Sequence, residues 1–219
     1  MMTNKKELEV ALCQGLASEM DAFLGAHRFL REDGSLEYSR QIQDGSQKLK
    51  MVFDLNPGYQ PSAIASLLPQ LAVSLDKVNE IVLEMLGDEP FLVGTSAVTF
   101  YQQLQNAAPQ EQRCVTWYVF DLSSNRTALA AIREFMRCWT IPFLDQYISA
   151  QAIARGHEER DQRLVNDRRF AICVAAAYVS LGQPDRAMKV LADKFRRPGA
   201  KHKYAKAFEY VANCVGGKN

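Results

Sequence analysis

The chain has little of what usually reveals function in a sequence. Its 219 residues include only five cysteines and three histidines. The cysteines are odd in number, lie far apart and form no C-x-x-C pair, which excludes a dense disulfide framework and the usual ligand spacing of a structural zinc site. We therefore expect reduced cysteines, with Cys138 and Cys173 buried as small apolar side chains of helices.

An excess of one charge and long apolar runs are also missing. Lys and Arg number 26 against 25 Asp and Glu, a formal net charge of +1. This balance gives no support to nucleic acid as a partner. No stretch approaches the ~20 apolar residues that a membrane helix requires, and the amphipathic N-terminus lacks the apolar centre of a signal peptide. We expect a cytoplasmic protein that does not bind a membrane.

Motifs of catalysis and metal binding are absent as well. The sequence holds no G-x-S-x-G, no G-x-x-x-x-G-K-[ST] and no G-x-G-x-x-G. His157 has acidic neighbours, but adjacent charges on a helix point in different directions, so a solvated face is expected there. A cysteine nucleophile would need a nearby histidine, and Cys114 or Cys138 with His27 is the pair to test. We expect no catalytic residue, no metal and no cofactor.

Hydrophobic periodicity predicts a mixed fold that begins with a helix. Leucine and methionine residues recur every four positions before Gly25, so they share one face of a helix that Thr3 or Asn4 can cap. Apolar residues then alternate with polar ones on both sides of an Asp-Gly pair at 44–45, a strong signal for a β-hairpin with one covered face. We expect its second strand to continue to Leu55.

The next segment mixes extended and helical signals. Pro69 lacks the N–H that a central strand needs, so residues 62–76 are expected to form an extended segment interrupted at this proline. Asp76 can cap the short helix that follows, and Gly87 ends it. The apolar residues between these two positions share one helical face.

A second hairpin is expected further along the chain. Residues 95–104 and 113–121 both have strand-like patterns, and the turn-forming sequence NAAPQEQ joins them. The run CVTWYVF within the second segment is apolar on both faces, which predicts a central position in the sheet.

The largest apolar stripe lies in residues 121–147. Its members recur at steps of three and four and therefore share one helical face: Leu129, Ile132, Met136, Trp139, Phe143 and Tyr147. Ser123 or Ser124 can cap this helix, with Asp121 as a cap or turn residue. Because proline removes an N–H and crowds the preceding turn, we expect two helices joined by a bend near Pro142.

The rest of the chain has the pattern of helices only. The charged stretch 148–169 has few apolar residues and predicts a solvated helix or linker. It suggests an α+β domain at 1–150 and a helical extension at 151–219, or one continuous domain. Beyond it, apolar residues at helical spacing predict a helix that ends at Gly182, a second that begins with Pro184, and a last helix near the C-terminus.

One stretch of this tail resembles a known repeat. AAAYVSLGQPDRAMKVLADKF is similar to a tetratricopeptide-type helix hairpin, because Ala177, Tyr178, Gly182 and Ala187 stand where that repeat places small, aromatic, glycine and alanine residues. The repeat architecture needs about three copies to bury a continuous face, and no second copy occurs. We interpret the hairpin as a way of packing two helices.

The layout of the first 150 residues resembles small bacterial α+β proteins of the domain-of-unknown-function kind. The shared features are the amphipathic N-terminal helix running into HRFLREDGSLEYSRQ, a β-meander, and a W-x-x-P-F-L-D-x-Y-like segment at 139–147. Some proteins of similar architecture look like immunity or accessory factors associated with bacterial toxins. The resemblance implies a binding role and no active site.

The remaining candidates are partner-binding residues. The segment KFRRPGAKHKYAKAF is the strongest local charge signal, and its cations are expected to face an acidic protein surface, whereas Tyr204 and Phe208 fit the helical stripe and pack inward. Exposed tyrosines on an open polar sheet face would make a recognition surface. The candidate partner-binding residues are Tyr59, Tyr101, Arg196, Arg197, Lys201 and Lys203.

Together these patterns predict an α+β fold: an antiparallel sheet of about five strands packed by helices, with an all-helical C-terminal extension. The leading functional hypothesis is a non-enzymatic protein-binding protein of a bacterial cytosol, such as an immunity factor that occludes a partner protein. The alternative is a small-molecule-binding protein or an enzyme that uses a cleft between sheet and helical tail. A third hypothesis is a structural subunit of a larger complex.

Overall fold

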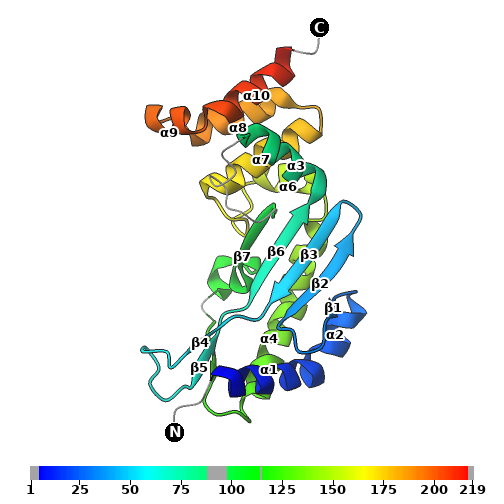
Figure 1. Cartoon of the computed structure of the whole chain (residues 1–219), viewed down its shortest axis with the longest axis vertical. Coiled ribbons are helices and arrows are strands. Elements are labelled where there is room, and N and C mark those ends of the chain that lie inside the picture. The colour runs from blue at the N-terminus through cyan, green and yellow to red at the C-terminus, as the bar shows by residue number, and fades with distance from the viewer. Residues whose placement is uncertain (1–4, 88–97, 114, 217–219) are drawn as a thin grey trace. The chain divides into compact units, whose positions relative to one another are not determined.

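The computed structural model describes residues 5–87, 98–113 and 115–216 (Figure 1). The helices are α1 (Lys5–Glu19), α2 (Asp21–Ala26), α3 (Asp76–Leu86), α4 (Asn125–Phe135), α5 (Ile141–Gln146), α6 (Ala150–Glu158), α7 (Arg168–Ser180), α8 (Pro184–Lys194), α9 (Pro198–Lys203) and α10 (Ala205–Gly216). The described residues also contain shorter helical turns: the 3₁₀ helices η2 (Leu104–Ala107) and η3 (Gln110–Gln112), and the π-helical turn η4 (Met136–Thr140). The expected caps Thr3 and Asn4, Cys114, and residues 95–97 of the expected second hairpin lie outside the described residues.

The strands form two antiparallel sheets, which confirms the α+β fold class. They are β1 (Leu30–Arg31), β2 (Glu37–Ile42), β3 (Gly45–Lys50), β4 (Phe53–Leu55), β5 (Ala65–Leu67), β6 (Gln70–Leu75), β7 (Phe100–Gln103) and β8 (Trp117–Val119). The first sheet has the order β1-β2-β3-β6-β7, and the second has the order β4-β5-β8. The hairpin expected around residues 44–45 is confirmed as β2-β3. At its turn a Cβ on Gly45 would lie 2.0 Å from the Ser74 carbonyl oxygen, so only glycine permits this close approach of β6.

The second expected hairpin is wrong. β7 belongs to the five-stranded sheet and β8 to the three-stranded sheet, so the two strands are not partners. The NAAPQEQ segment between them contains η3 and the end of η2. The apolar run around Trp117 also lies in the last strand of its sheet, where β8 pairs with β5 and with no second strand among the described residues. Helix α4 packs on β8, in which Trp117 and Val119 are buried and Tyr118 is half-buried, so the expected central position is wrong.

The strand expected to reach Leu55 is split between the two sheets. β3 ends at Lys50 and β4 begins at Phe53. In between, the Met51 N–H donates to the Leu36 carbonyl at 2.8 Å, whereas the Val52 carbonyl accepts from the Leu68 N–H at 2.7 Å. The chain therefore changes its hydrogen-bonding partners within two residues, and the alternation of apolar side chains continues across the change.

The interruption at Pro69 is confirmed, because β5 ends before it and β6 begins after it. The proline contributes its carbonyl, which accepts from the Leu104 N–H at 2.8 Å. Helix α3 then begins one residue earlier than expected: Asp76 is its first residue and Leu75 its N-cap. Gly87 ends the helix with φ +54, as expected.

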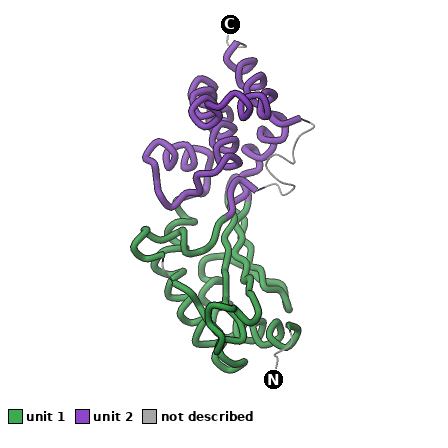
Figure 2. The backbone as a smooth tube through the Cα atoms, turned by 90° about the vertical axis from the view of Figure 1, so that its left-hand side faces the viewer, with its two compact units in different colours: residues 1–42, 46–72, 102–146 green, residues 43–45, 73–101, 147–219 purple. Residues whose placement is uncertain are grey.

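The described chain divides into two compact units (Figure 2). Unit 1 comprises residues 1–42, 46–72 and 102–146, and unit 2 comprises 43–45, 73–101 and 147–219. Unit 2 thus takes in α3 and β7 as well as the helical tail. The boundary expected near residue 150 stays a prediction.

In unit 1 the first helix packs on α4, which follows it by more than a hundred residues. A Cβ on Gly15 would meet Leu129 Cδ1 at 2.6 Å and Asn125 Oδ1 at 2.8 Å, so glycine sets the close approach of the two helices. The Arg133 guanidinium of α4 donates to the Glu19 carbonyl at the end of α1, at 3.1 Å. This pair of helices forms one wall of the unit 1 core.

A buried polar bridge links the sheet to α5 in the same unit. The Gln47 side chain is fully buried in β3, and its amide donates to the Leu144 carbonyl at 2.8 Å. Arg40 donates to the Gln47 amide oxygen at 2.8 Å and to the Asp145 carboxylate at 2.6 Å. Its guanidinium also lies over the Phe29 ring, 4.6 Å from the centroid. Both polar ends of Gln47 therefore have partners, as a buried amide requires.

The bend expected near Pro142 takes the form of the π-helical turn η4. Proline at the second position of α5 cannot donate to the preceding turn, and the wider turn places an extra residue there. The extra residue shifts the apolar face: Thr140 is fully buried, whereas Trp139 is only half-buried. Cys138 is exposed, so its expected burial is wrong, while Cys173 in α7 is buried as expected.

In unit 2, helices α6, α7 and α8 pack in sequence. The charged stretch expected to be a solvated helix or linker contains α6, which buries Ala152, Ile153 and Ala154 against α7. The expectation of a solvated segment is therefore wrong for this helix. Gly182, at φ +70, follows the end of α7, and Pro184 begins α8, as expected.

The last turns of the chain are two helices. The expected single helix is divided at Tyr204 into α9 and α10, and α10 packs on α8 and α3. Tyr204 and Val211 are buried as expected, whereas Phe208 is half-buried and Val215 is exposed. The Phe195 and Tyr204 rings lie 4.3 Å apart and close the joint between α8 and α9.

Candidate functional site

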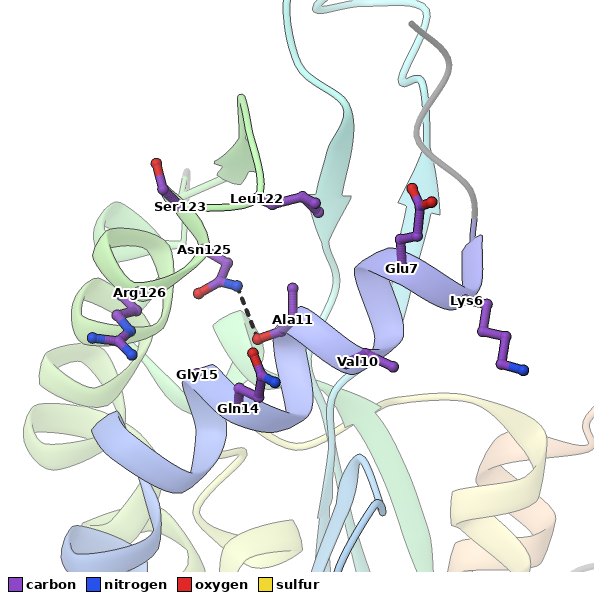
Figure 3. A pocket seen from close by; sticks show the side chains of 10 residues that line it. All are labelled: Lys6, Glu7, Val10, Ala11, Gln14, Gly15, Leu122, Ser123, Asn125 and Arg126. Carbon is purple, nitrogen blue, oxygen red and sulfur yellow. Dashed lines mark hydrogen bonds between the residues drawn. The ribbon is translucent and has the colours of Figure 1, made fainter.

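A concavity of unit 1 lies between α1 and the start of α4 (Figure 3). It has a volume of about 950 Å³. We call it the α1–α4 pocket, and its lining residues are Lys6, Glu7, Val10, Ala11, Gln14, Gly15, Leu122, Ser123, Asn125 and Arg126. Three other pockets have volumes of about 400, 180 and 460 Å³.

A tight turn positions one wall of the pocket. The Asp121 carboxylate accepts from the backbone N–H groups of Ser123 and Ser124, both at 2.8 Å. The Ser124 hydroxyl in turn accepts from the Phe120 and Asp121 N–H groups at 3.0 Å. Hydrogen bonds from Ser123 and Ser124 lower the pKa of Asp121. The expected role of Asp121 as a turn residue is thus confirmed, and Leu122 is held pointing into the pocket.

Asn125 forms the floor where the two helices meet. Its amide donates to the Ala11 carbonyl at 2.9 Å, and its side chain is almost completely buried. The amide oxygen has no hydrogen-bond partner among the described residues and lies close to Gly15. The floor is therefore rigid and polar, and it depends on the absence of a side chain at position 15.

The rim of the pocket is apolar and exposed. Val10 is 51% exposed and Leu122 is 41% exposed, although both are aliphatic. Two residues before Leu122, Phe120 begins a row of rings: Phe120 lies 6.2 Å from Tyr118, and Tyr118 lies 6.2 Å from Tyr59. We call Tyr59, Tyr118 and Phe120 the aromatic ridge.

The ridge has a fixed base. Tyr118 is the central residue of β8, which pairs with β5, and the Tyr59 hydroxyl lies 3.2 Å from the Ser66 hydroxyl of β5. Tyr59 is 65% exposed and Phe120 is 47% exposed. Large aromatic side chains anchored at their base and open to solvent at their faces are typical of protein-binding surfaces.

The pocket offers little catalytic chemistry. Its ten lining residues include Lys6, Glu7 and Arg126, but no histidine, cysteine or tyrosine. In the described residues no three His, Cys, Asp or Glu side chains are grouped so as to hold a metal ion. His27 lies against the Phe23 ring, and no hydrogen bond joins it to Cys138 in the described part of unit 1. The arrangement suits binding better than proton transfer or nucleophilic attack.

Two carboxylate clusters, each formed by an aspartate, an arginine and a tyrosine, hold the fold in place; the Asp161 side chain is 13% exposed and the Asp21 side chain is 41% exposed. In unit 2 the fully buried Tyr147 donates its hydroxyl to Asp161 at 2.5 Å, and Arg163 donates to the same carboxylate at 2.7 Å. Burial raises the pKa of Asp161, but the hydrogen bonds from Arg163 and Tyr147 outweigh it and leave this pKa below its ordinary value. Such a carboxylate stays ionised at neutral pH and acts as a structural anchor.

Unit 1 has the equivalent cluster at Asp21. Arg31 donates to both Asp21 oxygens, at 3.0 and 2.8 Å, and the Tyr38 hydroxyl also donates to Asp21. The hydrogen bond from Arg31 lowers the pKa of Asp21, whereas burial raises the pKa of Tyr38. This cluster fixes β1 and β2 against α2.

The residues expected to bind a partner are exposed but lie in different units. Tyr59 is in unit 1, as part of the aromatic ridge. Tyr101 is in β7 of unit 2, where the Arg169 guanidinium lies 5.5 Å from its ring centroid.

The expected cationic residues form one exposed surface in unit 2. We call it the basic tail surface, and it consists of Arg196, Arg197, Lys201, His202 and Lys203. Arg196 pairs with Asp193 at 2.9 Å, and Lys201 lies 5.5 Å from the Phe208 ring centroid. Phe195 and Tyr204 are buried beneath the surface, as expected for Tyr204.

The sequence missed the pocket and most of the ridge. Val10 and Leu122 lie outside the apolar rows from which the helices were predicted, and Phe120 belongs to a strand-like run. Their exposure follows from the pairing of α1 with α4, which no local pattern predicts. Only Tyr59, between two prolines, carried a local signal of exposure.

No protein-family model, curated protein or solved structure matches this chain. Within the described residues, no helix combines the length and the apolar character needed to span a bilayer.

Proposed function

We propose that this chain is a protein-binding protein that contacts its partner through the aromatic ridge and the α1–α4 pocket. The single observation that carries the proposal is the juxtaposition of exposed rings and exposed aliphatic rim residues beside a pocket of about 950 Å³. Isolated exposed apolar side chains are ordinary, but rings in contact beside a concave site are not.

Burial of this surface would supply the binding energy. Tyr59 is 65% exposed and Phe120 is 47% exposed, and aromatic residues that become fully buried at the centre of an interface are common hot spots. The pocket would accept one side chain of the partner between Val10 and Leu122. Occlusion of the partner's surface then follows from the contact itself and requires no chemical step.

A neutralising role in a bacterial cytosol is the specific form of the proposal. Its support is the resemblance of the first 150 residues to small bacterial proteins, some of which look like toxin-associated immunity or accessory factors, together with a pocket whose lining residues include no histidine or cysteine. In that role the partner is a toxin whose surface the ridge covers. The first experiment identifies this partner.

The first experiment is an affinity pull-down of the tagged full-length chain from its native host, with bound proteins identified by mass spectrometry. The test variant is Tyr59→Ser with Phe120→Ser, and the matched control is Leu30→Ser, which changes an exposed aliphatic residue of unit 1 outside the ridge. We expect one stoichiometric partner that the double variant loses and the control retains. Recovery of the chain alone, or equal retention by all three proteins, contradicts the proposal.

The second candidate function is the binding of a small molecule. The volume of the α1–α4 pocket falls within the ~300–1,000 Å³ typical of ligand sites. The pocket lies within unit 1, at a place other than the cleft expected between sheet and tail. Native mass spectrometry of the purified chain tests this function: a co-purified mass that a Val10→Arg variant loses favours it, and an unliganded mass opposes it.

A further inference from the structure

The basic tail surface is a second exposed feature, separate in sequence and in unit from the aromatic ridge. We propose that it binds an acidic polypeptide segment in extended conformation. This inference rests on the proposed protein-binding function and names the chemistry of a second contact on the partner.

The charge of this surface is largely uncompensated. No acidic residue occurs between Lys194 and Phe208. Lys194 has a partner within the chain, since its ammonium donates to the Asn166 carbonyl at 2.7 Å. Arg196 pairs with Asp193. Arg197 and Lys203 form no ion pair with any described residue and are exposed.

Stabilisation of the helix does not explain all of these cations. Lys201, His202 and Lys203 lie in the last turn of α9, where positive charge is favourable to the helix dipole. Arg197 is the N-cap residue, at the end where the same dipole disfavours a cation. The helix dipole therefore accounts for the cations at the end of α9 but not for Arg197.

The surface favours a polypeptide over nucleic acid. Single-stranded nucleic acid is held by aromatic rings on which bases stack, but Phe195 and Tyr204 are buried and Lys201 covers the Phe208 ring. Duplex nucleic acid and anionic membranes favour a broad basic face, whereas this chain has a net charge of only +1. The small patch fits carboxylates of a short segment.

The spacing of two cations matches an extended chain. The Lys201 N–H donates to the Arg197 carbonyl at 3.0 Å, so the backbones of the two residues are one helical turn apart. One turn is about 5.4 Å, close to the ~6.6 Å between alternate side chains of an extended strand. Alternating carboxylates would therefore meet Arg197 and Lys201 together.

The test measures binding of a fluorescein-labelled peptide of alternating glutamate and serine to the full-length chain, by fluorescence anisotropy at about 0.15 M salt. The comparison probes are an oligothymidylate of equal charge and vesicles of phosphatidylserine with phosphatidylcholine. We expect the peptide to bind most tightly. Arg197→Glu with Lys201→Glu should weaken peptide binding about tenfold or more.

The matched control is Lys77→Glu with Lys189→Glu, which makes the same change in net charge at exposed positions of α3 and α8 outside the surface. We expect peptide binding within about twofold of wild type. Absence of peptide binding, tighter binding of the oligothymidylate or the vesicles, or an equal loss in the control pair overturns the proposal. The ridge variant Tyr59→Ser with Phe120→Ser should bind the peptide as wild type does. The peptide measurement therefore tests the basic tail surface independently of the aromatic ridge.

Discussion

The two units are built from contacts of different range. In unit 1, α1 and α4 are joined by hydrogen bonds between residues 114 positions apart, such as Asn125 to Ala11 and Arg133 to Glu19. In unit 2, the neighbouring helices α6 and α7 pack on each other, as do α7 and α8, while α3 packs on α7 and α10 from far earlier in the sequence. Unit 1 thus depends on distant partners, whereas unit 2 combines contacts between neighbouring helices with one distant helix.

The exposed surfaces of the two units also differ in whether distant or neighbouring residues form them. Unit 1 presents uncharged rings beside a pocket that two distant helices create, and unit 2 presents cations from a single short segment. A contact at the rings should persist at high salt because it depends on apolar burial, whereas a contact at the cations should weaken as salt screens it. A surface formed by elements that are distant in sequence is therefore harder to predict than a surface formed by one continuous segment.

The largest expected effect is on stability and tests whether both units depend on glycine at a helix crossing. A Cβ on Gly156 would lie 2.5 Å from the Tyr147 hydroxyl, and one on Gly15 would lie 2.6 Å from Leu129 Cδ1. Since Tyr147 is buried and held by Asp161, its ring has the least room to move. We expect Gly156→Ala to lower the free energy of unfolding by about 2–3 kcal/mol, and Gly15→Ala by about 1–2 kcal/mol, measured by urea denaturation.

The controls for these variants are Gly25→Ala in unit 1 and Gly199→Ala in unit 2. At both positions a Cβ would meet nothing within 4 Å, and both glycines are helical. Alanine is the better helix former, so we expect no loss or a gain of up to about 1 kcal/mol. Equal stability of Gly15→Ala and Gly25→Ala would show that the α1–α4 crossing is looser than the distances indicate.

A smaller effect on the free energy of unfolding is expected at acidic pH, where both units should lose stability. Asp21 and Asp161 have pKa values lowered in the folded state, so the stability that each adds is present above the unfolded value, about 3.9, and is lost as pH falls through the folded value. We expect Asp161→Asn to lower the free energy of unfolding by about 1–2 kcal/mol at pH 7. The difference from wild type should shrink as pH falls below about 4.

The measurement is the thermal midpoint of wild type, Asp21→Asn and Asp161→Asn between neutral and acidic pH. A difference that stays constant with pH would mean that the carboxylate charge contributes nothing and that the variants act through packing alone. Asp193→Asn serves as the control, because this exposed residue pairs only with the exposed Arg196. We expect its midpoint to follow that of wild type at every pH.

The range of contacts decides how much of the molecule the sequence could predict. The helix end at Gly182 and the start at Pro184 depend on residues next to each other in the chain, and both are confirmed. The fold class and the hairpin at residues 44–45 rest on equally local patterns. The pairing of β7 and β8 was wrong because each strand bonds to a partner far away in sequence, and periodicity contains no information on partners.

The same reasoning applies to the candidate site. The basic tail surface could be predicted because its cations lie within one segment of the sequence. The α1–α4 pocket could not, since it exists only where α1 meets the start of α4. Burial of α6 was missed for a related reason: small side chains such as Ala152 and Gly156 bury easily but contribute little to an apolar stripe.

The smallest effect concerns two cysteines whose predicted environments were the same. Cys173 lies in the buried core of α7, where desolvation raises the pKa of its thiol, and Cys138 lies exposed on η4. We expect a disulfide reagent to modify Cys138 rapidly in the native chain and Cys173 only on unfolding. The measurement is peptide mapping by mass spectrometry after labelling with and without urea.

Serine substitutions show whether the two cysteines, besides reacting at different rates, also contribute differently to the free energy of unfolding. Cys173→Ser places a hydroxyl in an apolar site and should lower the free energy of unfolding by about 1–2 kcal/mol, whereas Cys138→Ser should change it by less than about 0.5 kcal/mol. Equal labelling of the two thiols in the native state would mean that α7 opens as readily as the surface of η4. Their positions on the helices separate the two residues: Cys138 follows the buried Met136 by two residues and so lies on the opposite side of η4, whereas α7 is buried on all sides from Phe170 to Tyr178.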